Sequence, residues 1–420
     1  MFESPLKILA RLPPGVRLLV TGTLINKVGT FIVPYLTLVL LRDFHLSEGE
    51  AARLLFAYGV GSLVSILVGG ALTDRLGRRA TLMVSLFGSG VLAMAMGLAG
   101  SVRSFVPLLL VFGFVADLYR PAASAIVGDL LASHERATGF AALRLAVNLG
   151  FAFGMAVGGF IADWSWRWLF FGDGATTLLY GLVVLFFIPE TQPERASDPH
   201  PQEAPAQQDS PWRDPVFLQM AFASFTFSLA FFSDVTVLPL TITVGAGYPA
   251  AVYGALVGLN GLIIALFEIS AVAALKHHRR LRVAALGTAL LAFGFSITGL
   301  WLHWGWFLLA ILISTAGEIL ASPQQMSFVA DWAPPRALGR YLGLYQATWS
   351  LSLAVSPALL LPLHGRLGEA RFWVLLGCVA MPAALILRRL DRVADRPELL
   401  RGLSGPRPDP VLLGAIGPEG

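Results

Sequence analysis

Charge is the first thing this sequence has little of: Asp, Glu, Lys and Arg make up only 13% of its 420 residues. A soluble domain carries charge at about a quarter of its positions. The shortage extends along the whole chain, because long apolar runs recur from one end to the other and the mean hydropathy is +0.70. Runs of about 18 or more apolar residues match a hydrocarbon core of about 30 Å. The composition therefore excludes a soluble protein and predicts an integral membrane protein.

Cysteine and metal-binding patterns are also missing. The single cysteine, Cys378, cannot form an intrachain disulfide or a cysteine-based metal site. The sequence has no paired catalytic signature, no His-rich cluster and no phosphate-binding glycine loop, and His277-His278 stands among arginines as loop charge. We expect no metal, no cofactor and no enzymatic activity.

The N-terminus lacks a small-residue cleavage signature, so Lys7, Arg11 and Arg17 are expected to precede a retained first helix. The net charge of +4 does not indicate a nucleic-acid partner, because the basic residues lie in short loops between apolar runs.

The apolar runs predict an all-α membrane protein with twelve transmembrane helices. We place them at 17–41, 52–73, 81–100, 105–131, 138–162, 167–188, 216–243, 250–274, 283–301, 305–331, 338–363 and 370–388. The Pro-, Gln- and acid-rich segment 189–214 is expected to be a flexible cytoplasmic linker between a six-helix unit at 1–188 and another at 215–390. The Pro- and Gly-rich segment 391–420 is expected to be a disordered tail.

Lys and Arg predict the orientation. With both termini in the cytoplasm, most of the 30 basic residues fall on the inner side, including Lys7, Arg195 and Arg336. The outer side receives Arg42, Arg53, Arg103, Arg167, Arg366 and Arg371. This bias places both ends in the cytoplasm. We expect a multi-pass protein of a bacterial inner membrane.

The two halves repeat each other. Pro121 matches Pro323 and Asp129 matches Asp331, each pair 202 positions apart, and an Arg-Ala-x-Gly motif follows in both halves. Spans 4–5 and 10–11 are therefore related elements in the same orientation, which predicts two pseudo-symmetric six-helix bundles.

The most specific motif joins spans 2 and 3 and reads GALTDRLGRR over residues 70–79. Gly77 allows a tight turn, and an ion pair is expected between Arg78 and Asp129 at the end of span 4. This decapeptide resembles the loop signature of the major facilitator superfamily. The resemblance implies that superfamily's fold, and it implies that the motif helps to hold the halves together when the cavity faces outward. The residues concerned are Gly70, Asp74, Arg75, Gly77, Arg78, Arg79 and Asp129.

Residues 26–29 resemble the drug:proton antiporter branch, and Pro189-Glu190-Thr191 after span 6 resembles an ending common in the superfamily. Glycines at 150, 154, 158 and 159 let another backbone approach span 5 closely. Gly150, Gly154, Gly158 and Gly159 resemble the antiporter signature of the superfamily, although Met155 stands where that pattern has proline. Plain close packing explains them equally well.

Ionisable residues within spans are functional candidates, since an unpaired charge there is costly. Five of them fall on spans 1, 4, 7 and 10, which line the central cavity in the superfamily: Lys27, Asp117, Arg120, Asp234 and Glu318. Asp117 beside Arg120 and Lys27 is expected to be ionised, whereas Glu318 has no sequence-near cation and is the better proton carrier. Asp234 is the reserve. A purely structural Asp117–Arg120–Lys27 network remains an alternative, and Asp173 and Glu268 are more simply structural.

These observations predict a secondary transporter that exports small amphipathic molecules in exchange for protons by alternating access. Aromatic residues spaced to reach the cavity would suit such a substrate: Phe31, Tyr35, Tyr119, Phe231, Phe232 and Trp349. A sugar or metabolite exporter and a nutrient uptake symporter remain open, and an integral membrane enzyme or a sensor is disfavoured. The expected partners are a small-molecule substrate, protons and the lipid bilayer, with no nucleic acid, and the chain is expected to act as a monomer.

Overall fold

The fold is seen in a computed structural model, which describes residues 11–131, 135–191, 210–275, 277–334 and 337–394. Within these ranges the chain is all helical, without strands. Lys7, Arg195, Arg336, most of the predicted linker and most of the predicted tail lie outside the described residues.

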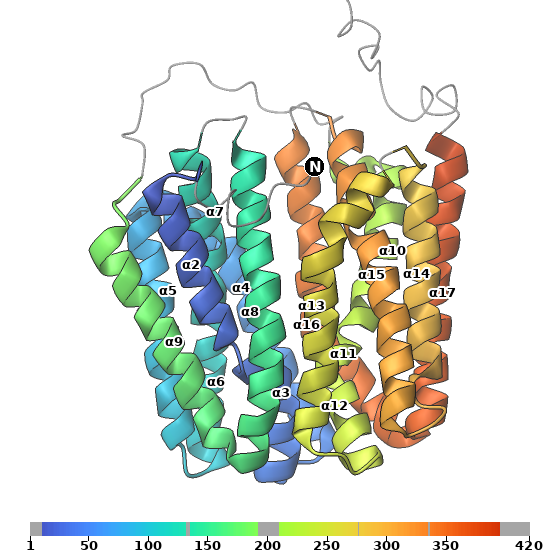
Figure 1. Cartoon of the computed structure of the whole chain (residues 1–420), viewed down its shortest axis with the longest axis horizontal. Coiled ribbons are helices and arrows are strands. Elements are labelled where there is room, and N and C mark those ends of the chain that lie inside the picture. Colours follow the sequence, from blue (N-terminus) through green and yellow to red (C-terminus); the bar gives the residue numbers. More distant parts are fainter. Residues whose placement is uncertain (1–10, 132–134, 192–209, 276, 335–336, 395–420) are drawn as a thin grey trace, which may run out of the picture.

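The described residues contain twelve helical segments long and apolar enough to cross a membrane. Their bounds agree with the predicted spans to within a few residues, and they form two bundles that stand side by side (Figure 1). The first bundle consists of α2 (Pro14–Val28), α3 (Ile32–Leu38), η1 (Val39–Asp43), α4 (Glu48–Leu76), α5 (Arg78–Leu98), α6 (Val102–Val115), η2 (Ala116–Leu118), α7 (Tyr119–Leu130), α8 (Arg136–Trp164) and α9 (Trp166–Phe187).

The second bundle begins with the short η4 (Pro211–Arg213). It continues with α10 (Pro215–Phe231), α11 (Ser233–Thr236), α12 (Leu238–Leu240), η5 (Thr241–Gly245), α13 (Ala250–Ala274), α14 (Arg280–Thr298), α15 (Trp304–Trp332), α16 (Leu338–Leu367) and α17 (Glu369–Ala394). The start of α2 and the end of α17 lie at the same end of the molecule, at the top of Figure 1, which we call the upper end. The opposite end is the lower end.

The second bundle repeats the first almost element for element. Matching elements begin 202 residues apart: α4 and α13 at Glu48 and Ala250, α5 and α14 at Arg78 and Arg280, α6 and α15 at Val102 and Trp304, and α8 and α16 at Arg136 and Leu338. The π-helical turns η1 and η5, at Val39 and Thr241, keep the same offset. The predicted pair of pseudo-symmetric six-helix bundles is therefore confirmed.

Spans 1, 4 and 7 are interrupted near mid-height. Span 1 breaks between α2 and α3, span 4 tightens into the 3-10 turn η2, and span 7 breaks around Phe232 and Val237. Pro34 supplies a reason in span 1, because it has no N–H for the carbonyl of Thr30 and therefore cannot continue the preceding helix. Within the new helix α3 the proline occupies the first turn, where the missing N–H costs little.

Candidate functional site

A cavity of about 490 Å³ lies between the two bundles, next to the interrupted spans. Its lining includes Lys27, Asp117 and Arg120 from the first bundle and Asp234 from the second. Four of the five ionisable residues singled out from the sequence therefore face one space.

On the first-bundle wall, Asp117 is buried and tightly held. Arg120 Nε donates to Asp117 Oδ1 at 2.6 Å, and Ser62 Oγ donates to the other carboxylate oxygen. Lys27 Nζ lies 5.0 Å from the ring centroid of Tyr119, within cation–π range. The side chain of Arg120 remains 56% exposed although it is paired, so much of its guanidinium faces the cavity.

The second-bundle wall is acidic, because Asp234 lines the cavity and Glu318 lies behind it. Asp234 Oδ1 is buried without a hydrogen-bond partner among the described residues. Glu318 does not line the cavity itself, but its Oε2 accepts a hydrogen bond at 3.2 Å from Asn260, which does. Asn260 also donates to Thr315.

The aromatic residues divide into two groups. Phe231, Phe232 and Trp349 line the cavity and pack on one another with centroid distances of 5.4 to 6.2 Å. Phe31 and Tyr35 do not reach it, contrary to the sequence-based expectation, because their side chains are buried in the core. The hydroxyl of Tyr35 donates to the carbonyl of Met155 at 2.6 Å.

Asp173 stabilises the break between α2 and α3 in span 1. Its Oδ2 accepts hydrogen bonds from the backbone N–H groups of Phe31 and Ile32, both at 3.2 Å, and its Oδ1 accepts one from Thr177. The carboxylate thus satisfies N–H groups that the first turn of α3 leaves without a partner inside the helix. The sequence gives no sign of this contact, because it joins residues 142 and 141 positions apart.

The glycines of α8 stand where neighbouring backbones come close. A Cβ on Gly150 would lie 2.4 Å from Lys27 Cβ, and one on Gly154 would lie 2.8 Å from the carbonyl oxygen of Val28. Gly159 meets the other bundle, since a Cβ there would lie 2.7 Å from Ala250 O. Gly158 faces the rings of Tyr35 and Phe31. Helix α8 runs unbroken past Met155, so these residues serve close packing within and between the bundles.

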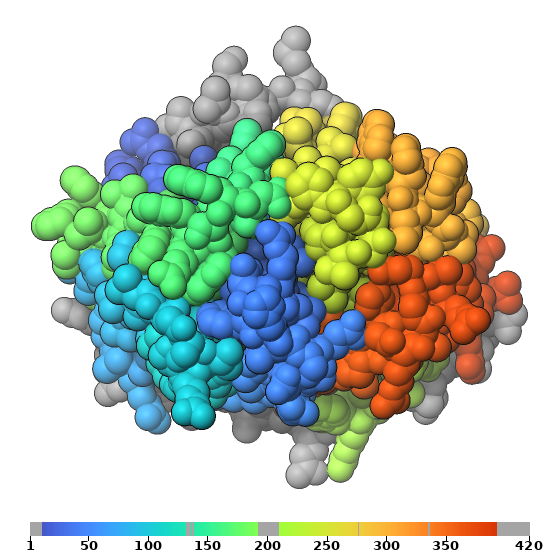
Figure 2. All heavy atoms as spheres, turned by 90° about the horizontal axis from the view of Figure 1, so that it is seen from below, coloured from blue at the N-terminus to red at the C-terminus, as the bar shows by residue number. Residues whose placement is uncertain are grey.

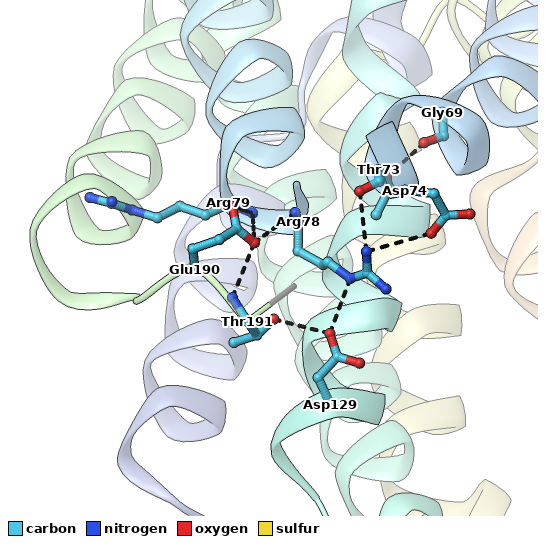
Figure 3. Close-up of polar contacts among 8 residues, drawn as sticks. All are labelled: Gly69, Thr73, Asp74, Arg78, Arg79, Asp129, Glu190 and Thr191. Atoms are coloured by element: carbon cyan, nitrogen blue, oxygen red, sulfur yellow. Dashed lines mark hydrogen bonds and ion pairs between the residues drawn. The ribbon is translucent and has the colours of Figure 1, made fainter. Parts of the chain in front are cut away.

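The loop motif joins α4 to α5 at the upper end, and Figure 3 shows its polar contacts. Arg78 Nε binds Asp129 at 3.1 Å, and Arg78 Nη1 lies 3.5 Å from Asp74. Gly77 has a φ of +103°, a conformation that favours glycine, so the turn from α4 to α5 depends on it. Gly70 has open space around it, and Arg75 and Asp74 are exposed.

The chain after span 6 completes this cluster. The carboxylate of Glu190 accepts hydrogen bonds from the backbone N–H groups of Arg78 and Arg79, at 2.8 and 3.2 Å. Thr191 Oγ1 donates to Asp129 at 3.1 Å (Figure 3). The Pro-Glu-Thr sequence thereby caps the first turn of α5, where a carboxylate is electrostatically favoured.

The second bundle retains one contact of the loop motif, although its loop sequence does not resemble the motif. Arg280 forms an ion pair with Asp331, and both residues stand 202 positions after Arg78 and Asp129. The sequence analysis did not connect Arg280 with Asp331. The offset that matches Asp129 with Asp331 was the signal that would have found the pair.

Polar contacts join the bundles at the lower end. The carboxylate of Asp163, at the end of α8, accepts from the backbone N–H groups of Ala250 and Ala251 at the start of α13, at 2.8 and 2.9 Å. On the opposite side, His364 of α16 lies 3.7 Å from Glu48 of α4 and 3.1 Å from Glu369 of α17. Seen from below, elements of both bundles meet without a central opening (Figure 2). Sequence analysis did not identify Asp163 or His364.

Nearer the upper end, Arg144 of α8 pairs with Glu268 of α13. The sequence analysis named Glu268 but did not connect it with Arg144. Because the partners belong to different bundles, this ion pair also spans the interface beside the cavity.

The chain is similar to known membrane transporters. The family model described as Major Facilitator Superfamily matches residues 19–400. The uncharacterised MFS-type transporter YhjO of Bacillus subtilis is 24% identical over 94% of this chain and 98% of its own. A Na⁺, Li⁺, K⁺/H⁺ antiporter of Planococcus maritimus is 24% identical over 87% of this chain and 92% of its own. The quinolone resistance protein NorA of Staphylococcus aureus is 24% identical over 57% of this chain and 61% of its own.

Solved structures show the same fold at lower identity. A POT family transporter superimposes with a TM-score of 0.76 at 15% identity, covering 91% of this chain and 96% of the other. A D-xylose-proton symporter gives a TM-score of 0.72 at 19% identity over 89% and 97% of the two chains.

Proposed function

Because the chain belongs to the major facilitator superfamily, we propose that it is a proton-coupled exporter that moves small amphipathic molecules by alternating access. Members of this family are membrane transporters and not enzymes.

The acidic wall of the cavity carries this proposal. Asp234 has a buried oxygen without a hydrogen-bond partner among the described residues, and Glu318 has one neutral donor, Asn260. A buried carboxylate with so little compensation favours its protonated form or a bound cation. Two such groups beside a cavity between the bundles suit an exchange in which protons and substrate compete for one site.

The first-bundle wall, opposite, is better suited to positioning than to proton exchange. Asp117 is bound by both Arg120 and Ser62, so its charge is compensated without help from a proton. We assign proton exchange to Glu318 and Asp234, and we assign positioning of the wall and of the substrate to Lys27, Asp117 and Arg120.

The bundle contacts suit a cavity that is closed at the lower end. We take the upper end as cytoplasmic, because the basic loop residues and both described ends of the chain lie there. Asp163, His364 and Glu48 would then close the outer side, and the motif around Arg78 would lie on the cytoplasmic side. Opening the outer side requires the lower contacts to separate while the upper ends approach each other.

The printed descriptions of two relatives favour export. One is a cation/proton antiporter and the other is a quinolone resistance protein. Uptake by symport in the same fold is the competing outcome, and the direction of coupled flux separates the two.

The purified full chain, reconstituted in liposomes with an internal pH dye, tests this proposal. Amphipathic compounds that raise the thermal stability of the protein would be added on the cytoplasmic side under an imposed pH gradient. We expect antiport, in which the compound crosses the membrane in one direction and protons cross it in the other. Movement of protons with the substrate would indicate symport, and no compound-dependent proton movement would contradict coupled transport altogether.

A further inference from the structure

The two bundles present different charged groups to the cavity: the first lines it with two cations and two carboxylates, Asp117 and Asp173, and the described part of the second with Asp234. The cations that line it, Lys27 and Arg120, both lie in the first bundle. The acidic groups of the second bundle, Asp234 on the lining and Glu318 behind Asn260, face them. A molecule held between the bundles therefore meets a different chemistry on each side.

The first-bundle wall has N–H donors that its own carboxylates do not use. The carboxylate of Asp117 already receives Arg120 Nε and the Ser62 hydroxyl. The nearby Asp173 is committed to the backbone of α3 and to Thr177. The remaining N–H groups of the Arg120 guanidinium and the Lys27 ammonium have no carboxylate within ion-pair distance among the described residues. A planar anionic group on a ligand suits such a fork of donors.

The second-bundle wall has carboxylate oxygens that accept few hydrogen bonds from the described residues. Asp234 Oδ1 is buried without a hydrogen bond among the described residues, and no described Lys, Arg or His forms an ion pair with Asp234 or Glu318. An ammonium group on a ligand would supply the missing donor and compensate the charge of the Asp234 carboxylate.

Apolar surface lies beside the acidic wall. Phe231, Phe232 and Trp349 form one aromatic cluster on the cavity lining. These rings provide contact area for an apolar body and a face for a cation beside it.

We propose that the preferred substrates are zwitterions, in which an apolar or aromatic body carries a carboxylate at one end and an amine at the other. The carboxylate binds Arg120 and Lys27, and the ammonium binds at Asp234. This inference rests on the proposed function, since it names the substrate class of the same cavity. It also gives a reason for the cations on a wall that proton exchange does not require.

A matched set of four compounds tests it: 4′-(aminomethyl)biphenyl-4-carboxylic acid, its methyl ester, its N-acetyl derivative and the doubly capped neutral form. They share one aromatic body and differ only in which end is charged. Binding to the full chain would be measured by isothermal titration calorimetry, and transport by uptake into liposomes. We expect the zwitterion to bind at least about tenfold more tightly than either singly capped compound.

Variants assign each end of the ligand to a wall. Lys27→Gln, and Asp117→Asn combined with Arg120→Gln, should abolish the advantage of the acid over its ester. Asp234→Asn should abolish the advantage of the free amine over its N-acetyl form. The double variant removes a charge pair together, so it leaves no uncompensated carboxylate. Arg371→Gln, which changes an exposed arginine at the lower end, is the control and should keep the full preference.

The outcomes separate the two proposals. If the ester binds and is exchanged for protons as well as the zwitterion is, the zwitterion inference is overturned while proton-coupled export stands. Failure of the zwitterion to bind detectably also overturns the inference. If the zwitterion binds with the expected preference but moves no protons, the substrate class stands and proton coupling fails.

Discussion

At the scale of single residues, the account depends most on Glu318. Its carboxylate accepts a hydrogen bond from a neutral donor, Asn260. Replacing it with glutamine keeps an acceptor for Asn260 but removes the group that takes up a proton.

Glu318→Gln should therefore abolish proton-driven transport while leaving downhill exchange of substrate across the membrane. Counterflow of labelled substrate and pH-dye fluorescence, measured in the same liposomes, report the two activities separately. Glu50→Gln is the control, because a glutamine at that position still completes the cap at the start of α4. Proton-driven flux at the normal rate in Glu318→Gln would remove this residue from the mechanism.

Glycines differ in what they contribute. Gly154→Ala places a methyl group 2.8 Å from the Val28 carbonyl oxygen, so we expect a loss of about 1–3 kcal/mol in stability from overpacking. Gly70→Ala meets nothing within 4 Å and should be neutral or slightly stabilising in its helix. Thermal unfolding in detergent compares the two; equal melting temperatures would show that the α2–α8 contact is not tight.

At the scale of elements, the turn between α4 and α5 is the clearest case of a backbone requirement. Gly77 combines a φ of +103° with a ψ of 158°, a region that residues with a side chain rarely occupy. Gly77→Ala should cost about 1–3 kcal/mol. Gly339→Ala, at a position with open space and no positive φ, should not destabilise the protein. Denaturant unfolding of the two variants gives the comparison, and an equal effect would argue against strain at this turn.

The elements also show what the sequence can predict. Span positions follow from hydropathy alone, because each span must fill the bilayer, and the observed bounds agree closely with them. The break in span 1 was not predicted, since it needs Pro34 locally and Asp173 from a distant helix to satisfy the freed N–H groups. The cavity residues were recognisable because charge is rare in spans. Their hydrogen-bond partners were not, because Ser62 and Asn260 become neighbours of these residues only through helix packing.

At the scale of the whole molecule, the two bundle interfaces at the lower end are related by the internal repeat. Helix α8 meets α13 through Asp163, and α16 meets α4 through His364 and Glu48. Gly365, which stands 202 positions after Asp163, lies directly against Glu48. Both interfaces thus pair the end of one long helix with the start of another, and both must separate for the lower end to open.

Asp163→Asn should weaken one of these interfaces, because it removes a carboxylate from the positive end of α13. In a chain whose native cysteine is replaced by Cys378→Ser, the additional substitution Thr37→Cys places a thiol between the bundles, where Thr37 now donates to Val235 O. We expect Asp163→Asn to speed labelling of this thiol by an impermeant maleimide about two- to fivefold. Asp43→Asn, an exposed change at the same end, is the control. Unchanged labelling would show that Asp163 does not hold the lower end closed.

The central claim is that the two bundles move as units around the cavity, so that one end closes as the other opens. In the Cys378→Ser chain, spin labels at positions 103 and 371 report the lower end, and labels at 17 and 389 report the upper end. Their distances would be measured by double electron–electron resonance in mildly acidic and mildly alkaline buffer. We predict that the two distances change in opposite directions between these conditions. Fixed distances, or a change in the same direction at both ends, would contradict alternating access around this site.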